Sequence, residues 1–354
     1  FANSVKNRVS RFSVNGDRVG LSAGEPVILD NIPSPLGYHN AGWIGFGADQ
    51  KLCIAVGDGG GSGNRVNSQK INSLNGKILR INEDGTIPPD NPWRTEMRYV
   101  SESINPLGLS KRREIWAMGL RNPWRCRFNS VGKLFCADVG EHRQEEVDII
   151  SRGGNYGWPY AEGTLCPAGL FSDTSCPSAL DRPVYTYNQV SESSITGGDF
   201  GDKTNFPNSE RRYFFADYTG GWVKSVLLDA AYVPISGSEQ VIAEGLGGVV
   251  DLIAGPDGNL YYLDIIGGTL GKISVATRVN ERPIAKIAAD KESGPPPLIV
   301  GFSSAGSFDP DGDSLVYQWV FGDGFASNEA NPEHRYEFPG LYSAILRVGD
   351  GMAT

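Results

Sequence analysis

A strand-and-turn unit repeats four times along this chain, and the repeat restricts the fold more than any other feature. The segments "KLCIAVGDGG", "KLFCADVGEH", "RYFFADYTGG" and "NLYYLDIIGG" align without gaps from Lys51, Lys133, Arg212 and Asn259. Each is an apolar strand that ends in an acidic or glycine-rich turn. The last two begin 47 residues apart, close to the length of a β-propeller blade of about 40 to 50 residues. The repeat predicts a β-propeller with about four complete blades in this chain.

The composition agrees with an all-β fold. The 46 glycines and 22 prolines among 354 residues favour short strands joined by many turns. The formal charge is -9, and no Lys/Arg stripe follows the sequence, so nucleic acid is not an expected partner. No apolar run approaches the roughly 18 to 20 residues that span a bilayer. We expect a soluble globular protein.

The five cysteines divide by their surroundings. Cys126 and Cys136 flank a predicted hairpin centred near Val131, and Cys166 and Cys176 bracket a loop rich in proline, serine and glycine. Both pairs could form disulfides, and the alternative is buried free thiols. Cys53 lies in an apolar strand and is expected in the core. Disulfides together with the Gly/Pro-rich composition favour an extracellular or periplasmic location.

The character of the sequence changes near residue 279. The turn sequences "PDGD" and "FGDG" separate alternating strands there. Through "SFDPDGDSLVYQWVFGDG", "NPEHRYEFPGLY" and "LRVGDG", this part resembles the PKD family, an immunoglobulin-like β-sandwich. We therefore divide the chain into a propeller, residues 1–278, and a PKD domain, residues 279–354, whose last strand is expected to be cut short. The opening "NRVSRFSV" resembles the end of an earlier blade, so N-terminal blades are expected to be missing.

Three polar residues of the propeller are candidates for chemistry. His39 in "GYHNAGW" is either a base or a polar turn residue. Arg121 and Asn122 lie between two apolar strands in "IWAMGLRNPWRCRF". Arg121 could hold a carboxylate or polarise a ligand oxygen, or it could bind the carbonyls of its own loop.

Acidic residues gather in "ADVGEHRQEEVDII". Asp138, Glu141, Glu145 and Glu146 offer oxygen ligands that suit Ca²⁺, and a solvated acidic loop is the alternative. His142 has no second His or Cys at metal-ligand spacing, so we interpret it as a surface residue.

Two other motifs are interpreted as structural. "GDGGGSGN", residues 57–64, lacks the residues of a phosphate-binding loop and is expected to be a flexible turn. "DPDGD", residues 309–313, is expected to be a turn rather than a calcium site, and His334 is expected to be structural.

Residues 1 to about 276 resemble the glucose/sorbosone dehydrogenase family, which includes soluble sugar dehydrogenases that use pyrroloquinoline quinone (PQQ). The resemblance rests on "HNAGWIGFGADQKLCIAVGDGG", "NSLNGKILRINEDGTIPPDNPW", "EIWAMGLRNPW", "DVGEHRQEEVDII" and "GGNYGWPYAEG". It implies a six-bladed propeller. It also implies that His39 is the general base for oxidation of a sugar hydroxyl, that Arg121 is catalytic and lines the quinone with Asn122, and that Ser194 contacts the cofactor.

The same resemblance implies two calcium sites. Gly140 and Glu141 match positions whose carbonyls hold a catalytic Ca²⁺. Glu146 and Tyr156 match ligands of a structural Ca²⁺.

The sequence departs from the quinone enzymes at several positions. Tyr38 replaces the acidic residue before the base, so nothing obvious orients the imidazole. Thr219, Gly248 and Val250 stand where active members place the lysine and two arginines that anchor the PQQ carboxylates. Two hypotheses follow: a secreted PQQ-dependent aldose dehydrogenase, or a non-catalytic propeller that binds glycan or protein. A sugar or polysaccharide is the expected ligand, and the PKD domain could bind a cell-surface or matrix partner.

Overall fold

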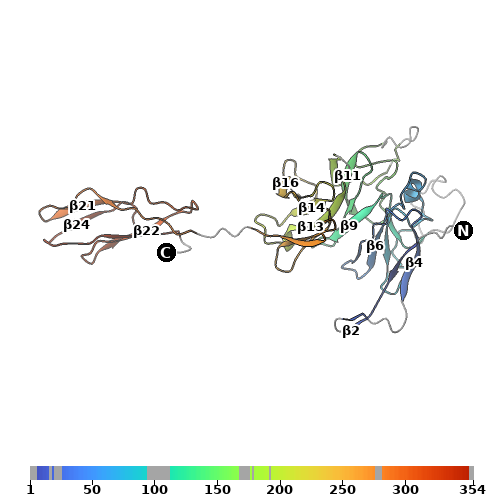
Figure 1. Ribbon diagram of the computed structural model, residues 1–354, viewed down its shortest axis with the longest axis horizontal. Coiled ribbons are helices and arrows are strands. Elements are labelled where there is room, and N and C mark those ends of the chain that lie inside the picture. The colour runs from blue at the N-terminus through green and yellow to red at the C-terminus, as the bar shows by residue number, and fades with distance from the viewer. Residues whose placement is uncertain are drawn as a thin grey trace. The chain divides into compact units, whose positions relative to one another are not determined.

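The computed structural model describes residues 6–15, 18–19, 26–93, 112–166, 176–177, 179–190, 193–275 and 281–350. The chain forms two compact units, Phe1–Val275 and Ala276–Thr354 (Figure 1). The boundary predicted between residues 278 and 279 lies outside the described residues.

The first unit is built from antiparallel sheets whose strands follow one another in chain order. The first sheet contains β5 (Ile44–Phe46), β6 (Leu52–Val56), β7 (Lys77–Ile81) and β8 (Ile115–Met118). The second contains β9 (Pro123–Phe128), β10 (Leu134–Asp138), β11 (Gln144–Ile150) and β12 (Tyr185–Asn188). The third contains β13 (Ile195–Phe200), β14 (Arg212–Asp217), β15 (Trp222–Leu227) and β16 (Gln240–Ala243), and the fourth β17 (Val249–Ala254), β18 (Leu260–Asp264) and β19 (Thr269–Ile273).

Shorter elements accompany these sheets. β1 (Lys6–Ser10) pairs with β4 (Val27–Pro33), and β2 (Val14–Asn15) pairs with β3 (Arg18–Val19). Two short 3₁₀ helices cover Arg65–Gln69 and Gly201–Lys203.

The sequence repeat corresponds to the second strand of each sheet, namely β6, β10, β14 and β18. The first strands of the last three sheets pack against one another, β9 beside β13 and β13 beside β17, and β6 of the first sheet lies beside β9. Because consecutive strands are antiparallel, the loops after β6, β8, β10 and β12 share one end of the sheets. The predicted all-β fold is confirmed, and this end gathers the loops that carry the candidate residues.

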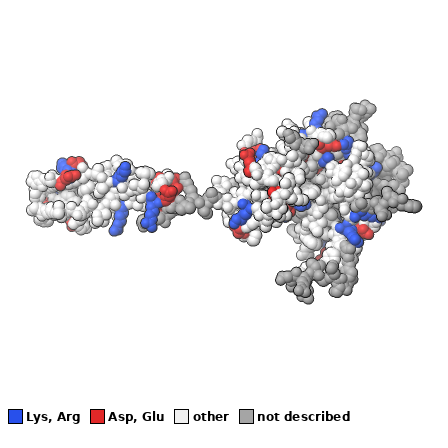
Figure 2. Space-filling view, in the orientation of Figure 1, with Lys and Arg blue, Asp and Glu red and all other residues white. Residues whose placement is uncertain are grey.

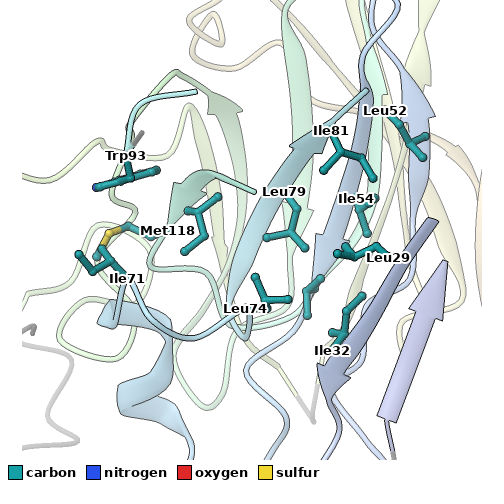
Figure 3. Close-up of a cluster of buried hydrophobic side chains, with 12 residues drawn as sticks. Leu29, Ile32, Leu52, Ile54, Ile71, Leu74, Leu79, Ile81, Trp93 and Met118 are labelled. Atoms are coloured by element: carbon teal, nitrogen blue, oxygen red, sulfur yellow. The ribbon is translucent and has the colours of Figure 1, made fainter. Parts of the chain in front are cut away.

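The hydrophobic core lies between the sheets. One cluster joins β4, β6 and β7 through Leu29, Ile54 and Leu79 (Figure 3). Every residue of β6, β7 and β10 is buried, because both faces of these strands pack against neighbouring elements. Such packing makes the loops at the strand ends well supported.

Both predicted disulfides are present. Cys126 of β9 and Cys136 of β10 form a cross-strand disulfide, and Cys166 is bonded to Cys176. Cys53 is a buried free cysteine, and burial raises the pKa of its thiol to about 12. It therefore behaves as an apolar core residue at neutral pH.

The second unit is a sandwich of two three-stranded sheets. One contains β20 (Ala288–Ala289), β21 (Leu298–Ser303) and β24 (Glu333–Tyr336), and the other β23 (Ala326–Ser327), β22 (Val316–Val320) and β25 (Ile345–Gly349). Trp319, Phe302 and Phe321 form the core between them. His334 stacks on Phe321 at 4.1 Å between ring centroids, and its Nε2 lies 2.7 Å from Asp323 Oδ2, in agreement with a structural role.

Charges of both signs are interspersed over the face shown in Figure 2, and the described residues of that face carry no continuous basic stripe. No helix among the described residues is long and apolar enough to cross a membrane.

Candidate functional site

His39 lies in the loop between β4 and β5, in the left-handed region of backbone conformation (φ 51°). A non-glycine residue there costs about 1 to 3 kcal/mol and persists when surrounding contacts hold it. The His39 carbonyl accepts a hydrogen bond from Gly59 N, and Ala41 N donates to Asn122 Oδ1 at 3.0 Å. The side chain of His39 is 20% exposed, so its imidazole is both held and reachable.

Asp58 orients this imidazole. Asp58 Oδ1 lies 2.8 Å from His39 Nδ1 and also accepts a hydrogen bond from Gly60 N, while Oδ2 accepts one from Trp158 Nε1. Burial favours the neutral acid, but the interactions with His39, Gly60 and Trp158 outweigh it and lower the pKa of Asp58. An ionised carboxylate only accepts hydrogen bonds, so Nδ1 of a neutral His39 carries the hydrogen and Nε2 is the free acceptor. The expectation that nothing orients His39 is wrong.

The glycines around Asp58 pack closely against the loop that carries His39. Gly59, Gly60 and Gly61 have φ values of 84°, 71° and 73°. Side chains at these positions would meet Pro35, the Tyr38 ring and Leu36 respectively. Residues 57–60 of the predicted flexible turn are therefore buried, because the loop that carries His39 packs directly on this backbone.

Arg121 and Asn122 lie beside the pair formed by His39 and Asp58. The Arg121 carbonyl accepts a hydrogen bond from Asp58 N at 2.7 Å. Arg121 Nη1 donates to the Val139 carbonyl at 3.0 Å, and its guanidinium carbon lies 5.4 Å from the Trp158 ring centroid. Its Nε is buried without a hydrogen-bond partner. Arg121 thus binds a nearby loop carbonyl, and its buried Nε–H has no partner in the chain.

Aspartates at the ends of the repeated strands accept hydrogen bonds from backbone N–H groups of the site loops and so hold these loops in place. The sequence analysis did not predict this role. Asp138 accepts hydrogen bonds from the backbone N–H groups of Arg121 and Asn122 at 2.8 and 2.6 Å. Asp217, at the same place in the next sheet, accepts from Ser194 N and Gly220 N. The signal was available, because the repeat alignment places both aspartates at its sixth position.

A cavity of about 290 Å³ opens next to Asn122. Its other lining residues are Trp124, Ser194, Ile195, Thr196, Tyr218, Val250 and Ile265. It therefore joins two predicted cofactor residues, Asn122 and Ser194, whereas His39 and Arg121 are not among its lining residues. None of the described residues that line it is a lysine or arginine, and Val250 occupies part of the wall.

A buried acidic cluster lies between β10 and β11. Carboxylate oxygens of Asp138, Glu146 and Asp148 all lie within 4.8 Å of one another, and the three residues are buried. Glu146 Oε2 and both Asp148 oxygens have no hydrogen-bond partner. Burial, followed by mutual repulsion, raises the pKa of Glu146 and Asp148 strongly, and burial raises the pKa of Asp138 to about 7. Three unsatisfied oxygens among hard acidic donors fit Ca²⁺. Asp138 and Glu146 were among the oxygen ligands expected from the sequence, whereas Asp148 was missed.

Tyr156, the other predicted ligand of the structural calcium ion, is buried. Its hydroxyl donates to the Ile149 carbonyl at 2.6 Å and accepts from Ser151 N. The phenol is thus already engaged, which leaves its backbone carbonyl as the group that could serve a metal.

The loop of Gly140 and Glu141 is held by another carboxylate. Glu162 Oε1 accepts hydrogen bonds from four consecutive backbone N–H groups, those of residues 141–144. The Glu141 side chain pairs with Arg65. His142 is 73% exposed, which confirms it as a surface residue.

The acidic turn of the second unit also brings three carboxylates, those of Asp309, Asp311 and Asp313, within 4.8 Å of one another. Asp309 Oδ1 accepts hydrogen bonds from the N–H groups of Asp311 and Asp313. These contacts are typical of a turn stabilised by an aspartate side chain, as the sequence predicts.

Comparisons with known proteins agree with this architecture. The profile of the Glucose / Sorbosone dehydrogenase family matches residues 2–266, and that of the PKD domain matches residues 280–354. HIPL1 protein of Arabidopsis thaliana is 38% identical over 218 residues, covering 53% of this chain and 30% of the plant protein. Aldose sugar dehydrogenase YliI of Escherichia coli (strain K12) is 27% identical over 243 residues, covering 67% of this chain and 60% of YliI.

A crystal structure of glucose dehydrogenase aligns with a TM-score of 0.61 at 25% identity, over 75% of this chain and 72% of the other. The chain spans less than a third of the length of HIPL1. Since the family profile covers nearly all of the first unit, this chain belongs to the glucose/sorbosone dehydrogenase family and carries a PKD domain after its propeller.

Proposed function

We propose that this chain is a sugar dehydrogenase-like protein that binds a sugar hydroxyl at His39 and takes up its proton. The contact between His39 Nδ1 and the buried carboxylate of Asp58 carries the proposal. A neutral imidazole suits proton transfer near neutral pH. Asp58 would hold the tautomer with a free Nε2 and stabilise the imidazolium that forms.

Arg121 and Asn122 would complete the site. Arg121 would direct its guanidinium, whose buried Nε has no hydrogen-bond partner in the chain, toward a ligand oxygen that gains negative charge. Asn122 supports the His39 loop through Ala41 and also lines the adjoining cavity. Ser194 would contribute a hydroxyl from the lining of that cavity.

Ca²⁺ fits the acidic cluster described above. Glu146, Asp138 and Asp148 would hold it, and the ion would offset the three oxygens of Glu146 and Asp148 that have no hydrogen-bond partner. The Tyr156 carbonyl is a further candidate ligand. For a catalytic Ca²⁺ the candidate ligands are the carbonyls of Gly140 and Glu141, in a loop that Glu162 holds in place.

PQQ, the oxidant of the family's quinone enzymes, does not fit the cavity well. PQQ carries three carboxylates, and burying each without a cationic partner costs several kcal/mol. Thr219, Gly248 and Val250 are uncharged, and the described residues around the cavity include no lysine or arginine.

The uncharged cavity wall favours a second candidate function. Tyr218, Val250 and Ile265 give the cavity a largely apolar lining, which suits binding of a glycan or a protein without oxidation. In both cases we propose a secreted protein, supported by its two disulfides. The PKD domain would then bind a cell-surface or matrix partner.

Titration of the purified chain with PQQ and Ca²⁺, followed by dye reduction with a panel of aldoses, separates the two functions. Quinone binding at micromolar concentration with turnover that His39→Ala abolishes supports the dehydrogenase. Sugar binding without quinone binding supports the second candidate. Turnover that survives His39→Ala would remove the assignment of His39 as the base.

A further inference from the structure

We infer that Tyr38 forms a stacking subsite for a pyranose ring beside His39. The inference rests on the proposed function of His39 as the residue that meets a sugar hydroxyl. It adds the group that selects the ring form of the sugar.

Tyr38 is an exposed aromatic side chain with a fixed position. Tyr38 is 49% exposed, although backbone and side-chain contacts hold the next residue, His39, in place. One side of its ring packs on Gly60, where any side chain would overlap Cδ2, Cε2 and Cζ of the tyrosine. About half of the residue's surface, 49%, remains exposed to solvent. A supported ring with an open surface can bind a ligand with little loss of conformational freedom.

The ring is placed directly beside the candidate base. The ring centroids of Tyr38 and His39 are 4.9 Å apart, and the two planes meet at 87°. A sugar ring seated on Tyr38 would therefore project its peripheral hydroxyls toward the side where the imidazole lies. The backbone contacts of residues 39, 41 and 58–60 fix this arrangement.

The chemistry of the ring indicates the class of ligand. The face of an aromatic ring carries partial negative charge and attracts weakly positive C–H groups. A pyranose presents a rigid patch of axial C–H groups on one face, whereas an open-chain polyol has no fixed apolar face. Tyr38 also stands where the resemblance places an acidic residue, so a charged acceptor is replaced here by an apolar surface. The site is thus suited to a sugar in its pyranose form.

Calorimetric titration of the full chain, without quinone, with methyl β-D-glucopyranoside and with sorbitol tests this inference. Tyr38→Ala should weaken glucoside binding by about three- to tenfold, the usual range for an aromatic contact. Tyr38→Phe should retain it, and Phe46→Ala, which removes another exposed aromatic, should leave it unchanged. Sorbitol binding should be weaker in the wild type and insensitive to Tyr38.

Equal glucoside affinity in the wild type and Tyr38→Ala would overturn the subsite, as would no measurable binding by the wild type. Neither result depends on turnover. Activity lost in His39→Ala with unchanged glucoside affinity in Tyr38→Ala would leave the proposed function standing and remove only the subsite. Tyr38-dependent binding without any dehydrogenase activity would leave the subsite standing and remove the proposed function.

Discussion

The indole Nε1 of Trp158 donates a 3.0 Å hydrogen bond to Oδ2 of Asp58, a residue 100 positions earlier in the chain. Trp158 is 2% exposed, and the guanidinium of Arg121 lies over its ring. This one buried side chain therefore connects the carboxylate that orients His39 with the candidate anion-stabilising residue.

Trp158→Phe should raise the pKa of Asp58. The substitution removes one of three hydrogen bonds to an ionised group, worth about 1.5 kcal/mol or more, so an increase of about one pH unit is expected. A ¹³C NMR titration of the Asp58 carboxyl group measures it. Trp43→Phe, at a buried tryptophan outside these contacts, is the control. An unchanged pKa would show that the indole contributes only packing.

Asp58→Asn should remove the preference of His39 for the tautomer that carries its hydrogen on Nδ1. An amide can donate to Nδ1 as well as accept from it, so the preference for Nδ1–H is lost. The ¹⁵N chemical shifts of the imidazole, in a chain with three histidines, report this directly. If the chain has dehydrogenase activity, turnover should fall roughly 10²- to 10⁴-fold, as expected for a base with the wrong tautomer. Asp49→Asn, at an exposed aspartate paired with Arg80, should change neither property.

Gly60→Ala should destabilise the His39 loop. The backbone has φ 71°, and the added methyl group would overlap the Tyr38 ring, so a loss of about 1 to 3 kcal/mol is expected. Gly63→Ala is the matched control, because a side chain there meets nothing within 4 Å. Denaturant unfolding measures both. Equal stability of the two variants would contradict the view that the glycine run supports residues 35–39.

Ca²⁺ should stabilise the propeller through Glu146, Asp138 and Asp148. A ligand at about 100 times its Kd adds about 2.7 kcal/mol of stability to the native state, seen as a rise in Tm by scanning calorimetry after chelation and readdition. Glu146→Gln should reduce this rise. Glu145→Gln is the control, because both oxygens of Glu145 already accept hydrogen bonds. A Ca²⁺ response that Glu146→Gln leaves intact would place the ion elsewhere.

The PKD domain should lose stability in acid through Asp323. Burial opposes ionisation of Asp323, but the hydrogen bond with His334 lowers its pKa. A carboxyl group with a lowered native pKa stabilises the fold above its unfolded pKa, about 4, and that contribution disappears as the pH falls through the native value. Amide exchange in β22 and β25 of the full chain should show this loss, and Asp323→Asn should reduce it. Glu337→Gln, at an exposed ion pair, should leave the acid dependence unchanged.

The sequence repeat was sufficient to predict the all-β fold and the strands that recur. A propeller strand is specified locally, by an apolar run and the turn that ends it, so Leu134–Asp138 and Arg212–Asp217 could be aligned from the sequence alone. The cysteine pairs were also predictable, because Cys126 and Cys136 flank a hairpin whose register places them opposite each other. The geometry of such motifs is determined by residues that lie close together in the sequence.

The site was predicted only in part, because its decisive contacts join distant loops. Sequence placed His39, Arg121 and Asn122 among the candidates, but it classed Asp58 with a flexible glycine turn. Only the packing of residues 35–39 on Gly57–Gly61 buries Asp58 against Trp158 and brings it to His39. In the same way, Asp138 and Asp148 become partners of Glu146 through the register of β10 with β11.

Local apolar periodicity and turn chemistry thus determined the strands, the order of the sheets and the residues worth testing. The tertiary structure decided which groups each carboxylate contacts. The energy of a buried charge depends on neighbours that the chain folds beside it, and for His39 those neighbours lie 19 and more residues away.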